Sequence, residues 1–304
     1  MPQVFTRRHE FLNYIKEQKR NRNSIGFVPT MGALHAGHAQ LIKQSTSENN
    51  CTVVSIFVNP KQFGPTEDFA KYPRTFQNDV DLIESMGAQA VFSPTVEEMY
   101  PPLFATQVSV TGITEVLCGA YRPGHFNGVT TVVMLLMNLA QADKMYLGQK
   151  DFQQVQVIKK MVQDLVHSTS IIMVPTIREQ DGLALSSRNR YLSEEARQIA
   201  SAVPKSLAAA AKLFLQGENN IAKLTKASQQ ELSKFGLEPQ YLEFRKVSDL
   251  TIKIDTNIQE ETVLAIAQFI ESNGSKVRLI DNVILDNNST NKQSLEDLIS
   301  RAFS

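Results

Sequence analysis

The sequence has few of the features that mark secreted proteins. Its 304 residues include only two cysteines, Cys51 and Cys118, which lie far apart and in no metal-like spacing. A disulfide framework is therefore not expected, and a reducing compartment is favoured. Near the N-terminus, Arg7, Arg8 and His9 are not followed by the apolar run of a secretory signal. We expect a cytoplasmic protein.

The sequence also lacks an excess of charge of either sign and has no long apolar run. Lysine plus arginine and aspartate plus glutamate both number 31, so the formal net charge is zero. No overall positive field attracts a nucleic-acid backbone to such a chain. The longest apolar stretch, residues 131–140, is too short to span a bilayer. We therefore expect neither nucleic acid nor a membrane as a partner.

The pattern of apolar residues predicts alternating helices and strands in the first part of the chain. A helix at 7–20 precedes a strand at 24–28, a helix at 38–47 and a strand at 51–57. Strand, helix and strand within about 35 residues form a right-handed unit with parallel strands. Further helices are expected at 75–86, at 129–140 and ending near 167, and further strands at 90–92, 106–110, 144–147 and 171–174.

These elements predict an α/β fold, a Rossmann-like doubly wound parallel sheet over residues 1–177. Beyond Pro175, helices precede strands, an order that predicts a smaller α+β domain over residues 178–283. The polar tail, residues 284–304, is expected to be poorly ordered, with room for a short helix at 294–302. Within the α+β domain, we expect helices at 193–215 and 219–234 and strands at 240–247, 261–270 and 276–280.

Residues 29–38, which read PTMGALHAGH, lie where the strand at 24–28 gives way to a helix. At this place in an open α/β sheet, backbone amides and a helix N-terminus can hold a phosphate group. Other turn-rich or polar segments follow later strands, at 58–64, 118–128 and 148–154. Loops at strand ends converge in such sheets, so we expect one nucleotide site there.

His35 and His38 allow three interpretations. As zinc ligands they would need further partners, and the neighbouring sequence offers neither a thiolate nor a His-Glu-x-x-His spacing. They could instead cap a helix or lie satisfied at the surface. A third hypothesis is that their ring N–H groups stabilise charge on a transferring phosphorus. The accompanying loops favour this third interpretation.

Other polar side chains suggest which residues of such a site would bind pyrophosphate and which would bind a small acid. Lys150 with residues 186–188 (Ser-Ser-Arg) combines an ammonium, two hydroxyls and a guanidinium, a set suited to a leaving pyrophosphate. Asn59, Gln62 and Gln154 carry neutral amides, which can hold a small polar acid without neutralising its carboxylate. Taken singly, each of these residues is more often an ordinary surface residue.

Six motifs, in order along residues 24–192, resemble the pantoate–β-alanine ligase (pantothenate synthetase) family of the nucleotidyltransferase superfamily. They are PTMGALHAGH at 29–38, FVNPKQF at 57–63, YPRT at 72–75, RPGHF at 122–126, GQKDFQQ at 148–154 and DGLALSSRN at 181–189.

The resemblance implies a two-step ATP-dependent ligation. Pantoate and ATP would give pantoyl adenylate and pyrophosphate, and β-alanine would then displace AMP to give pantothenate, a precursor of coenzyme A. It also implies Mg²⁺, a homodimer formed through the N-terminal domain, and a C-terminal domain that acts as a partial lid. Two alternatives stay open: adenylyl transfer to a different small substrate, and an ATP-binding homologue without catalysis.

The resemblance also implies roles for individual residues. The catalytic set would be His35, His38 and Lys150. Pantoate would be bound by Gln62 and Gln154, with Asn59 close by. Arg122 and His125 would line the cavity wall, and Asp79 would be a candidate magnesium ligand. ATP would contact Met31, Gly37, Gly148, Lys150, Asp151, Ser186, Ser187 and Arg188.

Three positions depart from the family pattern. Cys118 and Gln149 stand where glutamates are usual, and Leu135 stands where a lysine is common. Because the histidines, Lys150 and both glutamines remain, we expect activity to survive. The absence of a carboxylate at position 118 could still alter the loop geometry or the set of magnesium ligands.

Overall fold

The structure is a computed structural model that describes every residue except 66, 68, 253–255, 287 and 304. The chain forms two compact units. The first comprises Met1–Gln149 and Gln153–Val174, and the second comprises Lys150–Phe152 and Pro175–Ser304. Their boundary near residue 175 lies close to the expected one. The membership of Lys150–Phe152 in the second unit was not expected from the sequence.

No helix among the described residues is long and apolar enough to cross a membrane.

The first unit is built on a six-stranded sheet in which all the pairings are parallel. This confirms the predicted Rossmann-like fold. After β2 the chain builds the sheet outward on one side and then returns to the other side of β2. The carboxyl ends of β2 and β5 therefore flank the switch point, where ligands bind in such sheets. In spatial order the strands are β1 (Gln3–Phe5), β4 (Ala90–Phe92), β3 (Cys51–Ile56), β2 (Ile25–Thr30), β5 (Lys144–Gly148) and β6 (Ser170–Val174).

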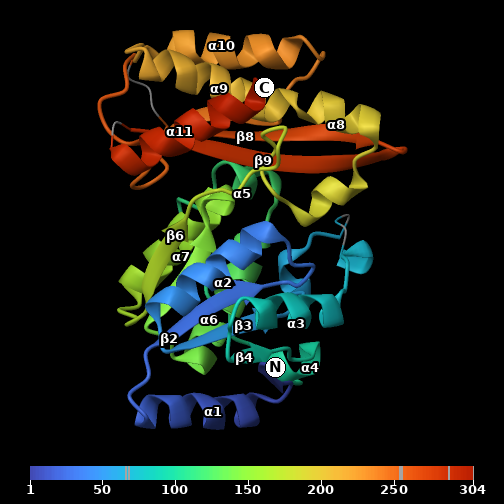
Figure 1. Cartoon of the computed structure of the whole chain (residues 1–304), viewed down its shortest axis with the longest axis vertical. Coiled ribbons are helices and arrows are strands. Elements are labelled where there is room, and N and C mark those ends of the chain that lie inside the picture. Colours follow the sequence, from blue (N-terminus) through green and yellow to red (C-terminus); the bar gives the residue numbers. More distant parts are fainter. Residues whose placement is uncertain (66, 68, 253–255, 287, 304) are drawn as a thin grey trace. The chain divides into compact units, whose positions relative to one another are not determined.

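Helices cover this sheet (Figure 1). Helix α2 packs on the central strands and on α3, while α6 packs on β2 and on α1. The apolar residues Val28, Val54 and Val91 of the strands form a core with Ile42 of α2 and Ile83 of α3. The α-helices that begin in this part of the chain are α1 (Arg8–Arg20), α2 (Ala36–Glu48), α3 (Phe76–Ser85), α4 (Val96–Met99), α5 (Cys118–Tyr121), α6 (His125–Ala140) and α7 (Phe152–Asp164).

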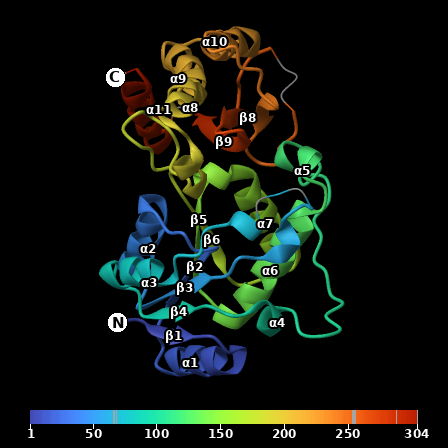
Figure 2. The same cartoon turned by 90° about the vertical axis from the view of Figure 1, so that its right-hand side faces the viewer.

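The second unit has an antiparallel sheet of three strands in the order β7-β8-β9. These are β7 (Tyr241–Lys246), β8 (Thr262–Ser272) and β9 (Ser275–Leu285). Its helices are α8 (Glu194–Ala200), α9 (Ala202–Leu215), α10 (Ile221–Ser233) and α11 (Ser289–Ala302). Helices α9 and α11 pack on β9, and α10 packs on α9 (Figure 2). The predicted smaller α+β fold is confirmed.

One expected strand is absent, and one observed strand was missed. Residues 106–110 form no strand, because hydroxyl groups of α6 take the backbone hydrogen bonds of Val108. The Val108 amide donates to Thr131 Oγ1 at 3.0 Å, and Thr130 Oγ1 donates to the Val108 carbonyl at 2.6 Å. The missed strand is β1, which is three residues long and lies at the sheet edge beside β4. Its alternation is too short to stand out in the sequence.

The helix expected at 193–215 is two helices, α8 and α9, that meet at Ser201. Pro204 explains the break. Proline has no amide to donate to the carbonyl of residue 200, and its ring would clash with that carbonyl in a continuous helix. In the first turn of α9 the missing amide costs nothing.

The expectation of a poorly ordered tail is wrong for its described part. Helix α11 is longer than the short helix expected, and Asn288 caps it by accepting the amide of Asn291 at 2.9 Å. Leu295, Leu298 and Ala302 are spaced so that they share one helix face, and they are buried in the core of the second unit. This stripe of apolar residues fixes the helix. Residues 287 and 304 lie outside the described residues.

Candidate active site

The loop after β2 brings the two predicted histidines together at the start of α2. His35 caps the helix, because its Nδ1 accepts the Gly37 amide at 3.2 Å, and Nδ1 of His38 accepts the His35 amide at 3.3 Å. The ring centroids lie 4.1 Å apart. Since each Nδ1 accepts a hydrogen bond, each neutral ring carries its proton on Nε2. Two Nε2–H donors thus lie beside the N-terminus of a 13-residue helix, where the helix dipole favours an anion.

Asp79 of α3 fixes the shape of this loop. Its carboxylate accepts the amides of Ala33 at 3.0 Å and Leu34 at 2.8 Å, and the hydroxyl of Thr75 at 3.1 Å. Asp79 is buried, with only 2% of its surface exposed. Gly32 has a φ of +79°, and a Cβ there would lie 3.0 Å from Asp79 Oδ2. A glycine and a buried carboxylate together set the path of the chain into His35.

These contacts bear on the magnesium role expected for Asp79. Both of its oxygens already serve the loop, and its neighbours are N–H and O–H donors rather than further carboxylates. Within the described residues, no group of three His, Cys, Asp or Glu side chains is placed to hold a metal ion. The surroundings of Asp79 therefore fit a loop anchor better than a magnesium ligand.

Gln62 joins the loop after β3 to the loop after β2. It lies in the short 3-10 helix η1 (Pro60–Gln62), and its Nε2 donates to Met31 Sδ at 3.2 Å. Its Oε1 accepts Asn59 Nδ2 at 3.0 Å. The structure thus brings together three residues that the sequence singled out, Met31, Asn59 and Gln62.

Asn59 acts as a buried support for Gln62. It is 1% exposed, and its amide group makes three further hydrogen bonds. Its Oδ1 accepts the Lys61 amide at 3.2 Å and the Tyr100 hydroxyl at 2.8 Å, and its Nδ2 donates to the Gly128 carbonyl at 3.1 Å. Burial raises the pKa of Tyr100, so its hydroxyl stays protonated and can donate.

Gly128 lets α6 approach η1 closely. A Cβ at this position would lie 2.2 Å from the Lys61 carbonyl oxygen. No side chain fits there without moving one of the two segments. Gly128, the last of the three glycines in the segment at 118–128, therefore serves packing next to Asn59.

Arg122 and His125 hold the backbone of Gln62. His125 Nδ1 lies 2.7 Å from the Gln62 carbonyl oxygen, which only accepts, so Nδ1 is the donor. In the neutral ring, Nε2 then accepts from Arg122 Nη1 at 3.0 Å. Arg122 also makes two 2.6 Å hydrogen bonds to the carboxylate of Glu67.

Glu67 was not predicted from the sequence. Burial raises the pKa of its carboxyl group, but hydrogen bonds and charge from Arg122 outweigh burial and hold the pKa below its ordinary value. Glu67 is therefore ionised at neutral pH and fixes the guanidinium. A lone acidic residue in a loop gives no sequence signal for this role.

Gln153 anchors the segment before Arg122, a role that the sequence also did not suggest. Its Oε1 accepts the Cys118 amide at 2.9 Å, and its Nε2 donates to the carbonyls of Ile113 and Val116 at 3.0 and 2.6 Å. A side chain of α7 thereby holds the backbone at Cys118. Gln154 follows in the first turn of α7 and is half-buried.

The remaining predicted residues divide between the two units. Gly148 ends β5 in the first unit. Lys150 and Asp151 lie in the 3-10 helix η3 (Gln149–Asp151), where Lys150 Nζ is 3.7 Å from Asp151 Oδ1. Both belong to the second unit.

The Ser-Ser-Arg segment at 186–188 also lies in the second unit. Ser186 caps the 3-10 helix η4 (Ser187–Tyr191), and its Oγ accepts the Arg188 amide at 3.2 Å. Asn189 holds the preceding turn by donating to the Ala184 carbonyl at 3.1 Å and to Glu179 at 2.6 Å. The backbone of this segment is therefore fixed from both sides.

The fold and these loops define a Rossmann-like α/β protein with a glycine–histidine loop at its switch point, a class that binds nucleotides at this place. Comparison with known sequences identifies the family. The family described as Pantoate-beta-alanine ligase matches residues 3–284. The chain is 47% identical to the pantothenate synthetase of Moorella thermoacetica, over 91% of this chain and 96% of the relative. It is 49% identical to that of a Thermoanaerobacter species, strain X514, over the same shares of the two chains.

Solved structures agree. The pantothenate synthetase of Thermus thermophilus superimposes with a TM-score of 0.87 at 39% identity, covering 94% of this chain and all of that one. The pantoate-beta-alanine ligase of Francisella tularensis, complexed with beta-gamma ATP and beta-alanine, gives a TM-score of 0.74 at 33% identity, covering 95% and 99%. The chain therefore belongs to the pantoate–beta-alanine ligase family, and it is a ligase.

Proposed function

We propose that this protein condenses pantoate with β-alanine to form pantothenate, with ATP converted to AMP and pyrophosphate through a pantoyl adenylate. Family membership supports the overall reaction, and so does the relative complexed with beta-gamma ATP and beta-alanine. The observation that carries the proposal is the pair His35 and His38, whose rings lie 4.1 Å apart at the start of α2, beside the switch point.

In the first step the pantoate carboxylate attacks the α-phosphorus of ATP. A carboxylate is already ionised at pH 7, so this attack needs no general base. It needs in-line positioning and stabilisation of the charge that builds on the phosphoryl oxygens. The Nε2–H groups of His35 and His38 supply donors for that charge. Met31 and Gly37, in the same loop, would contact the nucleotide.

Pyrophosphate leaves in the same step, and we assign it to the second unit. Lys150 and Arg188 would balance its charge, and the hydroxyls of Ser186 and Ser187 would donate to its oxygens. The cap formed by Ser186 supports this role, because it fixes the backbone that carries Arg188. Gly148 and Asp151, on either side of Lys150 in the chain, would lie against ATP.

Neutral amides would hold the acid. Gln62 and Gln154 can hydrogen-bond the hydroxyls and carboxylate of pantoate without neutralising the attacking charge. The contacts of Asn59 give it an indirect part, as the support of Gln62. Arg122 and His125 likewise act indirectly, because they hold the Gln62 backbone.

Magnesium would enter with ATP. Mg²⁺ is usually bound through substrate phosphates and one or two carboxylates, with several waters retained, rather than by a dedicated protein cage. The contacts of Asp79 do not favour it as the carboxylate ligand of this ion. The proposed steps therefore do not depend on a metal ion bound by the protein alone.

The homodimer through the first unit and the partial lid formed by the second are also proposals carried by family membership. Sedimentation of the purified protein tests the first. Protection of residues 178–190 from protease by ATP tests the second, because a segment covered by bound nucleotide resists cleavage.

Purified protein with pantoate, β-alanine and MgATP tests the proposed reaction. We expect pantothenate and AMP in equal amounts, with pyrophosphate release that requires pantoate. Pyrophosphate release with another small acid and not with pantoate would favour adenylyl transfer to a different substrate. ATP binding with AMP only at the background rate would show a homologue without catalysis.

A further inference from the structure

Two adjacent residues of β9, Asp281 and Asn282, point to opposite sides of the sheet. Successive side chains alternate along a strand, so Asp281 shares its side with Leu279 and Val283, which belong to the apolar clusters of the second unit. Asn282 lies on the other side. Both residues are 3% exposed. Buried polar groups need hydrogen-bond partners, and those of Asp281 and Asn282 lie in two separate segments of the chain.

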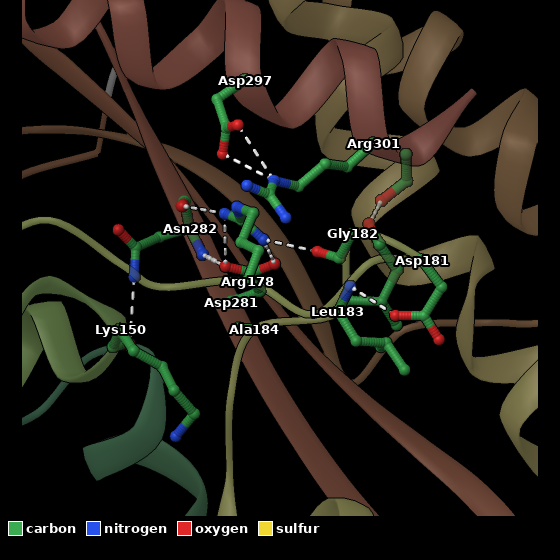
Figure 3. A network of polar contacts seen from close by, with 12 residues as sticks. Lys150, Arg178, Asp181, Gly182, Leu183, Ala184, Asp281, Asn282, Asp297 and Arg301 are labelled. Atoms are coloured by element: carbon green, nitrogen blue, oxygen red, sulfur yellow. Dashed lines mark hydrogen bonds and ion pairs between the residues drawn. The ribbon is translucent and has the colours of Figure 1, made fainter. Parts of the chain in front are cut away.

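Asp281 is paired with Arg178. Arg178 Nη1 and Nη2 lie 2.6 and 3.0 Å from the two carboxylate oxygens, and the side chains are 5% and 2% exposed (Figure 3). Arg178 Nη1 also donates to the Gly182 carbonyl at 3.0 Å. The turn that begins at Arg178 closes through an antiparallel bridge to Ala184. The chain continues directly from this turn into Ser186.

Asn282 is bonded to Lys150. Its Nδ2 donates to the Lys150 carbonyl at 3.0 Å, between residues 132 positions apart in the sequence (Figure 3). Its own amide donates to Asp281 Oδ1 at 2.8 Å, and its carbonyl accepts Arg178 Nη2 at 3.5 Å. The amide bond between Asp281 and Asn282 therefore lies at the centre of one connected set of polar contacts.

These contacts link the two groups that we assign to pyrophosphate. One side of β9 holds the turn that leads to residues 186–188, and the other side holds the backbone of Lys150. We propose that Asp281 and Asn282 are positioning residues that set Lys150 in register with the Ser186–Arg188 segment. This inference rests on the proposed role of Lys150 at the phosphates of ATP. Neither residue touches substrate; each acts through the backbone that it holds.

A single-turnover measurement of pyrophosphate formation tests the inference, with enzyme in excess over ATP and with saturating pantoate. The Asn282→Ala variant removes the donor to Lys150 and leaves the buried ion pair in place. We expect the first-order rate constant to fall about tenfold, because misplacing a reacting group by about 1 Å can cost up to 10²-fold. A purely structural defect would lower only the active fraction, which the burst amplitude with ATP in excess measures, and would leave the rate constant at saturating enzyme unchanged.

Ser228→Ala is the matched control. Ser228 is buried in the same unit and donates one hydrogen bond to a backbone carbonyl, that of Ser206, at 2.8 Å. The control removes a contact of the same kind that does not reach Lys150. Its rate constant should stay within twofold of the wild type. An equal slowing in both variants would overturn the inference.

The double variant Lys150→Ala/Asn282→Ala separates this inference from the proposed function. If Lys150→Ala alone turns over normally, the role proposed for Lys150 is wrong. If Lys150→Ala is slow and Asn282→Ala is normal, the positioning role is wrong while the proposed function stands. If both are slow, the double variant should be no slower than Lys150→Ala, because Asn282 then has nothing left to position. Additive losses would contradict this inference.

Discussion

The carboxylate of Asp79 accepts the amide of Leu34 at 2.8 Å, across 45 residues of sequence. This hydrogen bond ties α3 to the loop that presents the two histidines. Asp79 is buried, so removing its carboxylate would leave the backbone amides of Ala33 and Leu34 without an acceptor. We therefore expect this carboxylate to matter both for stability and for the geometry of the site.

Replacing Asp79 with asparagine should destabilise the protein. The Asn side chain directs one NH₂ group toward backbone donors, and a buried N–H left without an acceptor costs about 1–3 kcal/mol. Urea unfolding measures the loss, and the turnover number should fall with it. The control is Asp81→Asn, in which an exposed carboxylate of the same helix is changed. Equal stability of the two variants would remove Asp79 as the loop anchor.

His38→Asn separates catalysis from loop structure. An asparagine Oδ1 can replace Nδ1 as the acceptor of the His35 amide, but it offers no donor at the position of Nε2. We expect the turnover number to fall about 10²-fold or more, with little change in the unfolding temperature. His9→Ala, at an exposed histidine of α1, is the control. Near-normal turnover of His38→Asn would rule out a role in charge stabilisation.

Gln62→Ala should act mainly on pantoate. The variant removes an amide from the acid site while Arg122 and His125 still hold the backbone of residue 62. Steady-state kinetics should show a higher KM for pantoate and a nearly unchanged KM for ATP. Gln77→Ala, at an exposed amide of α3, should change neither value. A pantoate KM that stays at the wild-type value would exclude Gln62 from the acid site.

The Glu67–Arg122 pair should make stability depend on pH. The folded protein holds the pKa of Glu67 below its ordinary value, so the unfolded chain binds this proton more readily. The contribution of the pair is present above the ordinary pKa and is lost as pH falls through the lower, folded pKa. Unfolding at pH 7 should therefore show Glu67→Gln less stable than the wild type, and the gap should narrow below about pH 4. A gap of constant size would contradict this assignment.

Much of the fold could be predicted because its signals are local. The apolar runs at β2 and β3 and the glycines after β2 lie within short stretches of sequence, and they place the histidine loop correctly at the switch point. Local signals also explain the errors. The alternation at 106–110 is that of a strand, but the hydroxyls of Thr130 and Thr131 take its hydrogen bonds.

The supports of the site could not be predicted, because each joins distant parts of the chain. Glu67 meets Arg122 across 55 positions, and Asn282 meets Lys150 across 132. Periodicity and turn composition carry no information about such pairs. The substrate contacts named from the sequence stay predictions. Asn59, Asp79, Arg122 and His125 were named for contact with ligand or metal, and their supporting contacts emerge only in the structure.

In the reaction that we propose, a pantoate carboxylate oxygen attacks the α-phosphorus of ATP. Transfer of an oxygen label tests this step. With pantoate labelled with ¹⁸O in its carboxylate, the attacking oxygen stays on phosphorus when β-alanine displaces AMP. With both carboxylate oxygens labelled, we expect one ¹⁸O in each AMP formed and one ¹⁸O retained in each pantothenate, as measured by mass spectrometry. Unlabelled AMP, with ¹⁸O found instead in the released phosphates, would contradict it.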